Sequence, residues 1–454
     1  MKQILFAALF ALSCVSPSPR EKLPRLKISE DHRYIVTEDN QPFFWLGGTA
    51  WELLHRLDKD ETMMYLKDRA GKGFTVIQTV ILAELDGLNT PNANGDLPLV
   101  DNDPTKLNEA YFAHVDWVVA QAEKLGLYLG LLPTWGDKWN KKWGVGPEIF
   151  TPENAKIYGE LLAKRYVGHN NIIWILGGDR LPETDTQAQI VRALAHGIRN
   201  IDHSHLITYH PWGGTKATDA FNEDWLDLDM FQTGHDRRAR DFEFIRQSRV
   251  VSPPRPVING EPRYENHPNR FDAKNYGWMD DSDVRSAAYW TMLAGAAGYT
   301  YGCHDIWQMF DIQREPINGA RTSWQESIHL TGSKQLQYMK SLLNSFPWQE
   351  MKNDQSLILN ANPEDSSYVI CAMGKKRDFV LAYTPMGKPL TIDLSKMNAQ
   401  KVVAFWYNPR DGKSRKIGEY ATTDKPEFAP WSIGRGSDFV LVIMDVAAKY
   451  RLPD

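Results

Sequence analysis

Eight short apolar runs, each ending in polar or glycine residues, alternate with amphipathic stretches over residues 45–343. Such alternation predicts a parallel sheet covered by helices. The expected strands are residues 45–49, 75–82, 128–133, 172–176, 206–210, 229–233, 257–261 and 299–304. Eight strand–helix units favour an α/β fold of the (β/α)8 TIM-barrel type over an open doubly wound sheet, because the chain has no Gly-x-Gly-x-x-Gly turn.

Apolar residues at helical spacing place helices between these strands. The expected helices are residues 61–70, 111–125, 152–166, 186–201, 242–249, 283–297 and 333–343. Only the fifth connection, residues 212–228, is a weak helix candidate. Before the first strand, residues 34–36 and 43–46 flank a polar turn and predict a small hairpin.

Past Pro347 the hydrophobic period changes from that of a helix to that of a strand. Short β-rich segments separated by turn residues predict a small antiparallel β-sandwich. The segments are residues 368–372, 379–383, 390–394, 402–407 and 439–444. We therefore expect a signal or lipoprotein peptide at residues 1–20, a barrel at 21–347 and a β-sandwich at 348–454.

The first residues are typical of an export signal: Lys2 is positive, residues 4–12 are apolar, and Ser13 precedes Cys14. Cys14 resembles a bacterial lipoprotein acceptor, which predicts a lipid anchor and a place in the periplasm or at the outer-membrane surface. Plain secretion with cleavage nearby is the alternative. No later run approaches the about 18 apolar residues of a membrane span. The other two cysteines, Cys303 and Cys371, support neither a disulfide framework nor a zinc site.

Composition narrows the possible ligands. The formal net charge of -5 gives no basic excess for binding a phosphate backbone, so nucleic acid is excluded as a partner. The chain has 16 tryptophans, whose flat apolar faces stack on sugar rings, although the same residues also suit an aromatic core. An oligo- or polysaccharide is therefore the expected substrate, and we expect the protein to act as a monomer.

Two acids stand where a barrel places its active site, at the carboxyl ends of strands. Asp179 follows the fourth expected strand through Gly177 and Gly178, and Glu261 ends the seventh. Glycoside hydrolysis needs two carboxyl groups on either side of the scissile bond, which makes this pair the catalytic candidate. Either acid could instead cap a helix or pair with its neighbouring arginine, Arg180 or Arg263.

Other strand ends carry aromatic, imidazole and amide side chains suited to gripping sugars, although each alone could be packing. The predicted substrate-binding residues among them are Trp51, Trp135, Asp137, His210, Gln232, His235, His304 and Trp307. His210, His235, His304 and Asp305 lack the i, i+4 spacing of a helix-borne zinc site, so neither a metal nor another cofactor is expected. The chain also lacks a Gly-x-Ser-x-Gly elbow and a Walker loop.

Several segments resemble the apiosidase-like proteins of glycoside hydrolase family 140. They are residues 45–51 (WLGGTAW), 175–179 (ILGGD), 257–265 (VINGEPRYE) and 301–307 (YGCHDIW). Residues 405–412 (FWYNPRDG) and 438–443 (DFVLVI) look like the accompanying β-sandwich, which is labelled a collagen-binding domain. A sandwich packed on the barrel would equally suit a stabilising role.

The resemblance implies a retaining enzyme of gut Bacteroidetes type that cuts an apiose linkage of the pectin rhamnogalacturonan II. It implies Asp179 as general acid/base, Glu261 as nucleophile, and Tyr264 of the same motif among the substrate-binding residues. The common signature of this barrel clan has Asn-Glu where this chain has Gly178-Asp179. Two alternatives stay open: a retaining glycosidase of arabinofuranosidase or galactosidase type, and a non-catalytic carbohydrate-binding surface protein.

Overall fold

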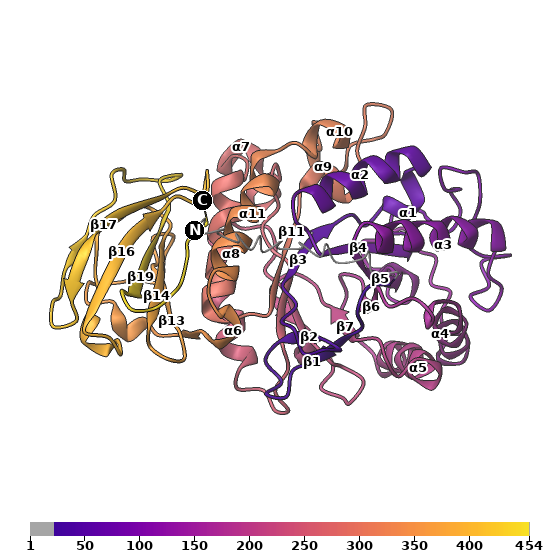
Figure 1. Cartoon of the computed structure of the whole chain (residues 1–454). Coiled ribbons are helices and arrows are strands. Elements are labelled where there is room, and N and C mark those ends of the chain that lie inside the picture. The colour runs from indigo at the N-terminus through magenta and orange to yellow at the C-terminus, as the bar shows by residue number, and fades with distance from the viewer. Residues whose placement is uncertain (1–21, 454) are drawn as a thin grey trace, which may run out of the picture.

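The computed structural model describes residues 22–453 and contains a (β/α)8 barrel (Figure 1). Neighbouring barrel strands pair in parallel in the order β7-β6-β5-β4-β3-β11-β10-β9. Between β7 and β9 the barrel closes through single hydrogen bonds, in which Asp227 N donates to Ile207 O (2.9 Å) and Thr208 Oγ1 to Leu228 O (2.8 Å). The strands are β3 (Trp45–Thr49), β4 (Val76–Leu82), β5 (Tyr128–Thr134), β6 (Ile172–Gly177), β7 (Ile207–His210), β9 (Asp229–Gln232), β10 (Val257–Glu261) and β11 (Gly298–Tyr301).

Helices surround this sheet as the sequence pattern predicted. The long ones are α2 (Lys59–Gly71), α3 (Glu109–Lys124), α4 (Pro152–Tyr166), α5 (Asp185–Ile201), α6 (Asp241–Ser248), α8 (Asp281–Ala294) and α11 (Thr331–Asn344). Capping explains where several begin: Asp58, Thr151 and Asp280 each form a capping box with the third helical residue. The fifth connection holds only the short strand β8 (Thr215–Lys216) and one 3-10 turn, η2 (Ala217–Asp219).

Two local expectations were wrong. The eighth strand ends at Tyr301 rather than at residue 304, and Gly302 after it lies against Tyr264, where a Cβ would be 1.9 Å from the ring. His304 instead begins the short helix α9 (His304–Trp307).

At the start, β2 (Ile35–Thr37) pairs with β1 (Leu26–Ile28), and its contact with the following segment is limited to a bridge between Val36 and Pro42 and a hydrogen bond from Phe43 N to Ile35 O (2.9 Å). The remaining short helices are α1 (Leu53–Arg56), α7 (Ala273–Tyr276) and α10 (Trp324–Ser327).

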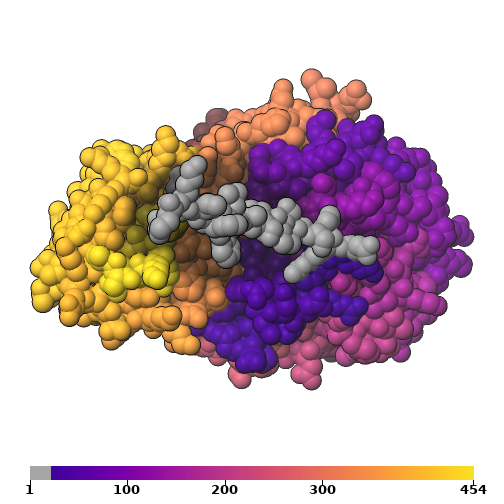
Figure 2. All heavy atoms as spheres, in the orientation of Figure 1, coloured from indigo at the N-terminus to yellow at the C-terminus, as the bar shows by residue number. Residues whose placement is uncertain are grey.

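A β-sandwich follows the barrel and forms one end of the molecule (Figures 1 and 2). Its six-stranded antiparallel sheet has the order β12 (Lys352–Asn353), β13 (Ile370–Met373), β14 (Phe379–Thr384), β19 (Phe439–Asp445), β16 (Lys401–Tyr407), β17 (Ser414–Ala421). The second sheet pairs β15 (Leu390–Thr391) with β18 (Glu427–Phe428). The strand expected over 390–394 is therefore shorter, and the 3-10 turn η7 (Leu394–Lys396) follows it.

The period of two along β14 explains why the sandwich packs against the barrel. Phe379, Leu381 and Tyr383 belong to the same hydrophobic core as the barrel, whereas Val380 and Ala382 point into the core of the sandwich itself. The sheet thus buries both faces. Helix α8 contacts β12, β13 and β14 and forms much of the contact surface on the barrel side.

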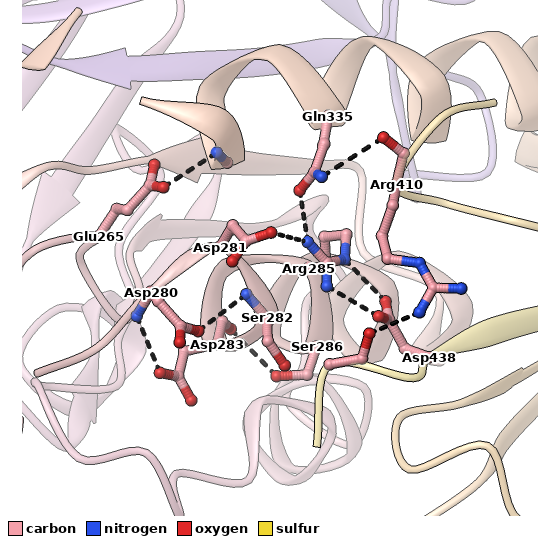
Figure 3. Close-up of polar contacts among 12 residues, drawn as sticks. Glu265, Asp280, Asp281, Ser282, Asp283, Arg285, Ser286, Gln335, Arg410 and Asp438 are labelled. Carbon is pink, nitrogen blue, oxygen red and sulfur yellow. Dashed lines mark hydrogen bonds and ion pairs between the residues drawn. The ribbon is translucent and has the colours of Figure 1, made fainter. Parts of the chain in front are cut away.

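A buried ion pair crosses this contact (Figure 3). Arg285 of α8 donates from Nε and Nη2 to the two carboxylate oxygens of Asp438, each at 2.8 Å, and Tyr383 Oη adds a third bond at 3.0 Å. Arg285 Nη1 also donates to Gln335 of α11, whose Nε2 donates to the carbonyl of Arg410 in the sandwich at 3.4 Å. Bidentate pairing of this kind fixes orientation as well as contact.

The expected export signal, including Cys14, lies outside the described residues. Within residues 22–453, no helix is both long and apolar enough to cross a bilayer.

Candidate active site

A cavity of about 570 Å³ opens at the carboxyl ends of the barrel strands, and we call it the catalytic cavity. Asp179 and Glu261 both line it, so the structure brings the two candidate acids together from β6 and β10. Six further predicted residues line the same cavity: Trp51, Trp135, His235, Tyr264, His304 and Trp307. An acid pair surrounded by aromatic rings is the arrangement expected of a sugar pocket.

Glu261 is the last residue of β10 and is only 6% exposed. The pairing of β10 with β9 shifts register between Asn259 and Glu261, and Gln78 donates from Nε2 to Gly260 O at 2.9 Å. This bulge re-aims the strand end, a common device beside active sites. The backbone under the carboxylate is therefore fixed by the neighbouring strand β9 and by Gln78 of the more distant strand β4.

Two histidines face the Glu261 carboxylate. His210 Nε2 lies 3.0 Å from Oε2, and His235 Nε2 lies 3.3 Å from Oε1. The backbone N–H of Asp179 points to His210 Nδ1 at 3.3 Å, which assigns the proton of that imidazole to Nε2, the nitrogen facing Glu261. His210 is fully buried and does not line the cavity, and it links the two acids through these contacts.

Asp179 sits on an unusual backbone. Gly177, Gly178 and Asp179 all have positive φ, at 97°, 79° and 59°. A Cβ on Gly178 would lie 2.6 Å from Gly136 N, which itself donates to Gly178 O at 3.0 Å. Glycine is therefore required at 178, and it lets the chain after β6 pass close to the end of β5. Strained backbone of this kind clusters at functional sites.

The environment separates the proton affinities of the two acids. Burial, reinforced by the negative charge of Glu261, raises the pKa of Asp179 from 3.8 to about 7. Burial acts in the same direction on Glu261, but its close contacts with His210 and His235 outweigh burial and lower the pKa of Glu261 well below its usual range. At neutral pH one acid is held ionised while the other keeps its proton for much of the time. Such divergence marks acid and base roles.

The two arginines beside the acids are hydrogen-bonded mainly to other partners. Arg263 turns away from Glu261 to pair with the buried Asp241 and to donate to Arg237 O at 2.9 Å. Arg180 donates to the backbone carbonyls of Asn140 and Asp179, at 2.9 and 2.8 Å, while its Nη1 lies 3.8 Å from the Asp179 carboxylate. Thr184 rather than Asp179 caps the following helix, and Arg263 pairs with Asp241 rather than with Glu261. Asp179 does keep a long ion-pair contact with Arg180, as the pairing alternative expected.

Asp137 is not where a substrate-gripping residue would lie. It is fully buried and does not line the catalytic cavity. Its carboxylate pairs with Lys138 Nζ at 2.7 Å and accepts a hydrogen bond from Gly146 N at 2.8 Å. The side chain thus fastens the loop that follows β5. Gln232, which was also expected to bind substrate, lines a smaller adjoining cavity rather than the catalytic cavity.

The structure adds residues that the strand-end reasoning missed. Glu84, two residues past β4, contributes a third carboxyl group to the catalytic cavity. Burial together with the negative charges of Asp179, Glu52 and Asp137 raises the pKa of Glu84 well above its usual value, so it can donate a hydrogen bond as a neutral acid. The other additional lining residues are Leu85, Trp143, Gly144, Val145, His267, Phe271, Ile317 and Asn318.

Three histidine rings form a row along one wall. His267 stacks on His235 with ring centroids 4.1 Å apart and meets His304 edge-on at 4.4 Å. Burial lowers the pKa of His304 to about 4, so this ring is neutral at physiological pH. Within residues 22–453, no three histidine, cysteine, aspartate or glutamate side chains are arranged to hold a metal ion.

Comparison with solved structures defines the class of protein. A protein described as a glycoside hydrolase matches with a TM-score of 0.87 and 33% identity, over 94% of this chain and 98% of its own. A glycoside hydrolase family 5 protein from Bacteroides vulgatus matches with the same TM-score and identity, over 95% and 97%. A family 39 glycoside hydrolase from Bacteroides cellulosilyticus shares the fold at 12% identity and a TM-score of 0.53, over 92% and 82%. The protein is a TIM-barrel glycoside hydrolase.

The family is more specific. Residues 29–350 match the family described as "Apiosidase-like, catalytic domain", and the chain belongs to that family. Residues 353–444 match the "Putative collagen-binding domain of a collagenase", in agreement with the resemblance of the tail. No curated protein matches the chain.

Proposed function

We propose that the protein hydrolyses glycosidic bonds with retention of configuration, with Glu261 as nucleophile and Asp179 as general acid/base. The observation that carries this assignment is the divergence of the two pKa values within one cavity, because an ionised carboxylate and a protonated one are what the first step needs.

In the first step Glu261 attacks the anomeric carbon and forms a glycosyl ester, while Asp179 gives its proton to the departing oxygen. In the second, Asp179 takes a proton from water, the water oxygen attacks the same carbon, and Glu261 leaves as a carboxylate. His210 and His235 hold Glu261 in place and stabilise its charge at both ends of the cycle. Tyr264 stays protonated, because burial and the Glu261 charge raise its pKa well above the usual value, so its hydroxyl can donate to substrate.

For the substrate we propose a plant cell-wall polysaccharide, and within it an apiose linkage of the pectin rhamnogalacturonan II. The family assignment supports this choice. The test is incubation with pectic, hemicellulosic and host glycans, followed by identification of the released sugar and NMR of the first anomer formed. Released apiose of retained configuration supports the proposal. Release of arabinose or galactose would replace the substrate, and an inverted anomer would remove the nucleophile role of Glu261.

Two variants test the catalytic pair. Glu261→Gln and Asp179→Asn should each lower turnover at least about 10³-fold without unfolding the protein, since both changes preserve side-chain shape. Near-normal turnover in either variant would refute the assignment. If the unaltered protein binds a glycan but hydrolyses none, it is a carbohydrate-binding surface protein.

We also propose that the protein is exported and anchored through Cys14, and that it acts as a monomer. The sequence around Cys14 supports the first part. Radiolabelled palmitate should enter the protein expressed in a bacterial host, and Cys14→Ala should abolish the label. Light scattering during gel filtration tests the second part, which a mass near twice 51.9 kDa would contradict.

A further inference from the structure

A second cavity, of about 270 Å³, adjoins the catalytic cavity, and we call it the side cavity. The two cavities share Asp179, Glu261, Trp143, His235 and Phe271, so the acids stand where one space passes into the other. The side cavity is lined in addition by Trp212, Gly213, Gln232 and Gly234. A glycosidase needs room on both sides of the bond it cuts, one for each sugar that the bond joins.

An exposed tryptophan forms part of this wall. Trp143 is 59% exposed, although tryptophan is usually well buried. Its ring stacks on that of Trp212, with centroids 6.1 Å apart and planes 25° from parallel. Lys142 Nζ lies 3.7 Å from the centroid of Trp212, and the Arg180 guanidinium lies 4.0 Å from that of Trp143. These cation–π contacts hold both rings in place and leave much of Trp143 open.

The loop that carries Trp143 is built to hold one shape. Asp137 accepts from Gly146 N at 2.8 Å, and the buried Arg180 donates to Asn140 O and Lys141 O at 2.9 and 3.2 Å. A Cβ on Gly144 would overlap the Asp137 side chain, which shows how tightly the loop is drawn over it. A pre-organised aromatic surface loses little conformational entropy when it binds.

A polar group in the side cavity is also suited to a sugar. Gln232 is 4% exposed, and its Oε1 has no hydrogen-bond partner among the described residues. Buried amide oxygens are normally bonded, so one left unpaired on a cavity wall is suited to accept a hydroxyl. A sugar ring offers a C–H face to a tryptophan and hydroxyls at its rim, which matches this combination.

We propose that the side cavity, with Trp143 and Trp212, is the subsite for the sugar ring on the leaving-group side of the scissile bond. This inference rests on the proposed function of Asp179 and Glu261. Asp179 gives its proton to the leaving oxygen, and Arg180, next in the chain, is stacked on Trp143, so the aromatic surface belongs to the proton donor's side. The preferred substrate is therefore an oligosaccharide whose leaving group is itself a sugar.

The test compares two leaving groups on the same glycone. One substrate is a pectic oligosaccharide that the unaltered protein cleaves, and the other is the glycosyl fluoride of the released sugar, whose leaving atom is too small to reach Trp212. Trp212 lines the side cavity and not the catalytic cavity, whereas Trp143 lines both. Trp212→Ala should therefore lower kcat/KM on the oligosaccharide by roughly tenfold or more, from the lost burial of one ring face. It should change kcat/KM on the fluoride less than about twofold. Trp212→Phe should recover most of the loss.

Trp431 provides a matched control, because it is 51% exposed and lies on the sandwich. Trp431→Ala should leave both rates unchanged. Equal losses on the two substrates in Trp212→Ala, or no loss on the oligosaccharide, would overturn the subsite. In the inactive Glu261→Gln background, Trp212→Ala should lower the affinity for the oligosaccharide by a similar factor, and this measurement does not depend on turnover. Failure of the unaltered protein on every glycan would instead count against the proposed function.

Discussion

Replacing Asp179 by asparagine should make the protein inactive and more stable. The folded-state pKa of Asp179 is raised from 3.8 to about 7, so the native state binds more protons than the unfolded state between pH 4 and 7. Stability then falls as pH rises through this window, and the full penalty applies above pH 7. A shift of about 3 units corresponds to about 4 kcal/mol. Because 22% of the side chain reaches solvent, we expect roughly half of that, about 2 kcal/mol.

The assay is denaturation by guanidinium chloride at pH 4.5 and at pH 8. Asp179→Asn should be nearly as stable as the unaltered protein at pH 4.5 and more stable at pH 8. Glu261→Gln is the matched control in the same cavity, and its expected effect on stability at pH 8 has the opposite sign. The lowered pKa of Glu261 contributes stability that is present above pH about 4.5 and lost as pH falls, so this variant should be less stable at pH 8. A destabilised Asp179→Asn, or a difference independent of pH, would refute the reasoning.

Three further outcomes follow from the same structure. The kcat/KM of the unaltered protein should fall about tenfold per pH unit above pH 7, as Asp179 loses its proton; a profile flat to pH 9 would contradict the donor role. Glu84→Gln, which keeps a neutral donor and acceptor, should stay within about threefold of normal kcat/KM, whereas Glu84→Ala should lose about tenfold; equal losses would mean that Glu84 acts as a carboxylate. Arg285→Met should lower the free energy of unfolding, measured by denaturation, by about 3–5 kcal/mol, because it leaves Asp438 buried without its partner. The double variant Arg285→Met, Asp438→Leu should lose much less, and similar losses in the two variants would mean that the pair contributes little.

The barrel could be predicted because its signal is repeated along the chain. Each strand is a short apolar run, and each long helix has an apolar stripe, so small errors at element ends leave the topology intact. The positions of Asp179 and Glu261 followed from the rule that barrel strands end at the active site. The missed Glu84 lies two residues after β4, the same offset that Asp179 has after β6, so the signal was present in the sequence.

The loops were harder to predict, because their side chains are aimed by hydrogen bonds that no periodic pattern encodes. Asp137 follows β5 as closely as a cavity residue should, yet its carboxylate turns beneath the loop to bind Gly146 N. Trp143, six residues further on, lies in the loop that this contact holds and lines the cavities together with both acids. Asp137, which was expected to touch the sugar, therefore acts by positioning Trp143, which lines both cavities.

The Gly178-Asp179 sequence, which departs from the Asn-Glu of related barrels, has a geometric explanation. No side chain fits at 178, because a Cβ would lie 2.6 Å from Gly136 N and 2.9 Å from the Trp135 Cα. The close approach brings the backbone of residue 179 over the end of β5, and aspartate tolerates the left-handed conformation there, at φ 59°, better than most residues do. A carboxyl one methylene shorter than glutamate suits a backbone held closer to the cavity. The close approach of Gly178 to Gly136 also lets the Asp179 N–H reach His210, whose ring faces Glu261. The positions of both acids therefore depend on the same backbone segment.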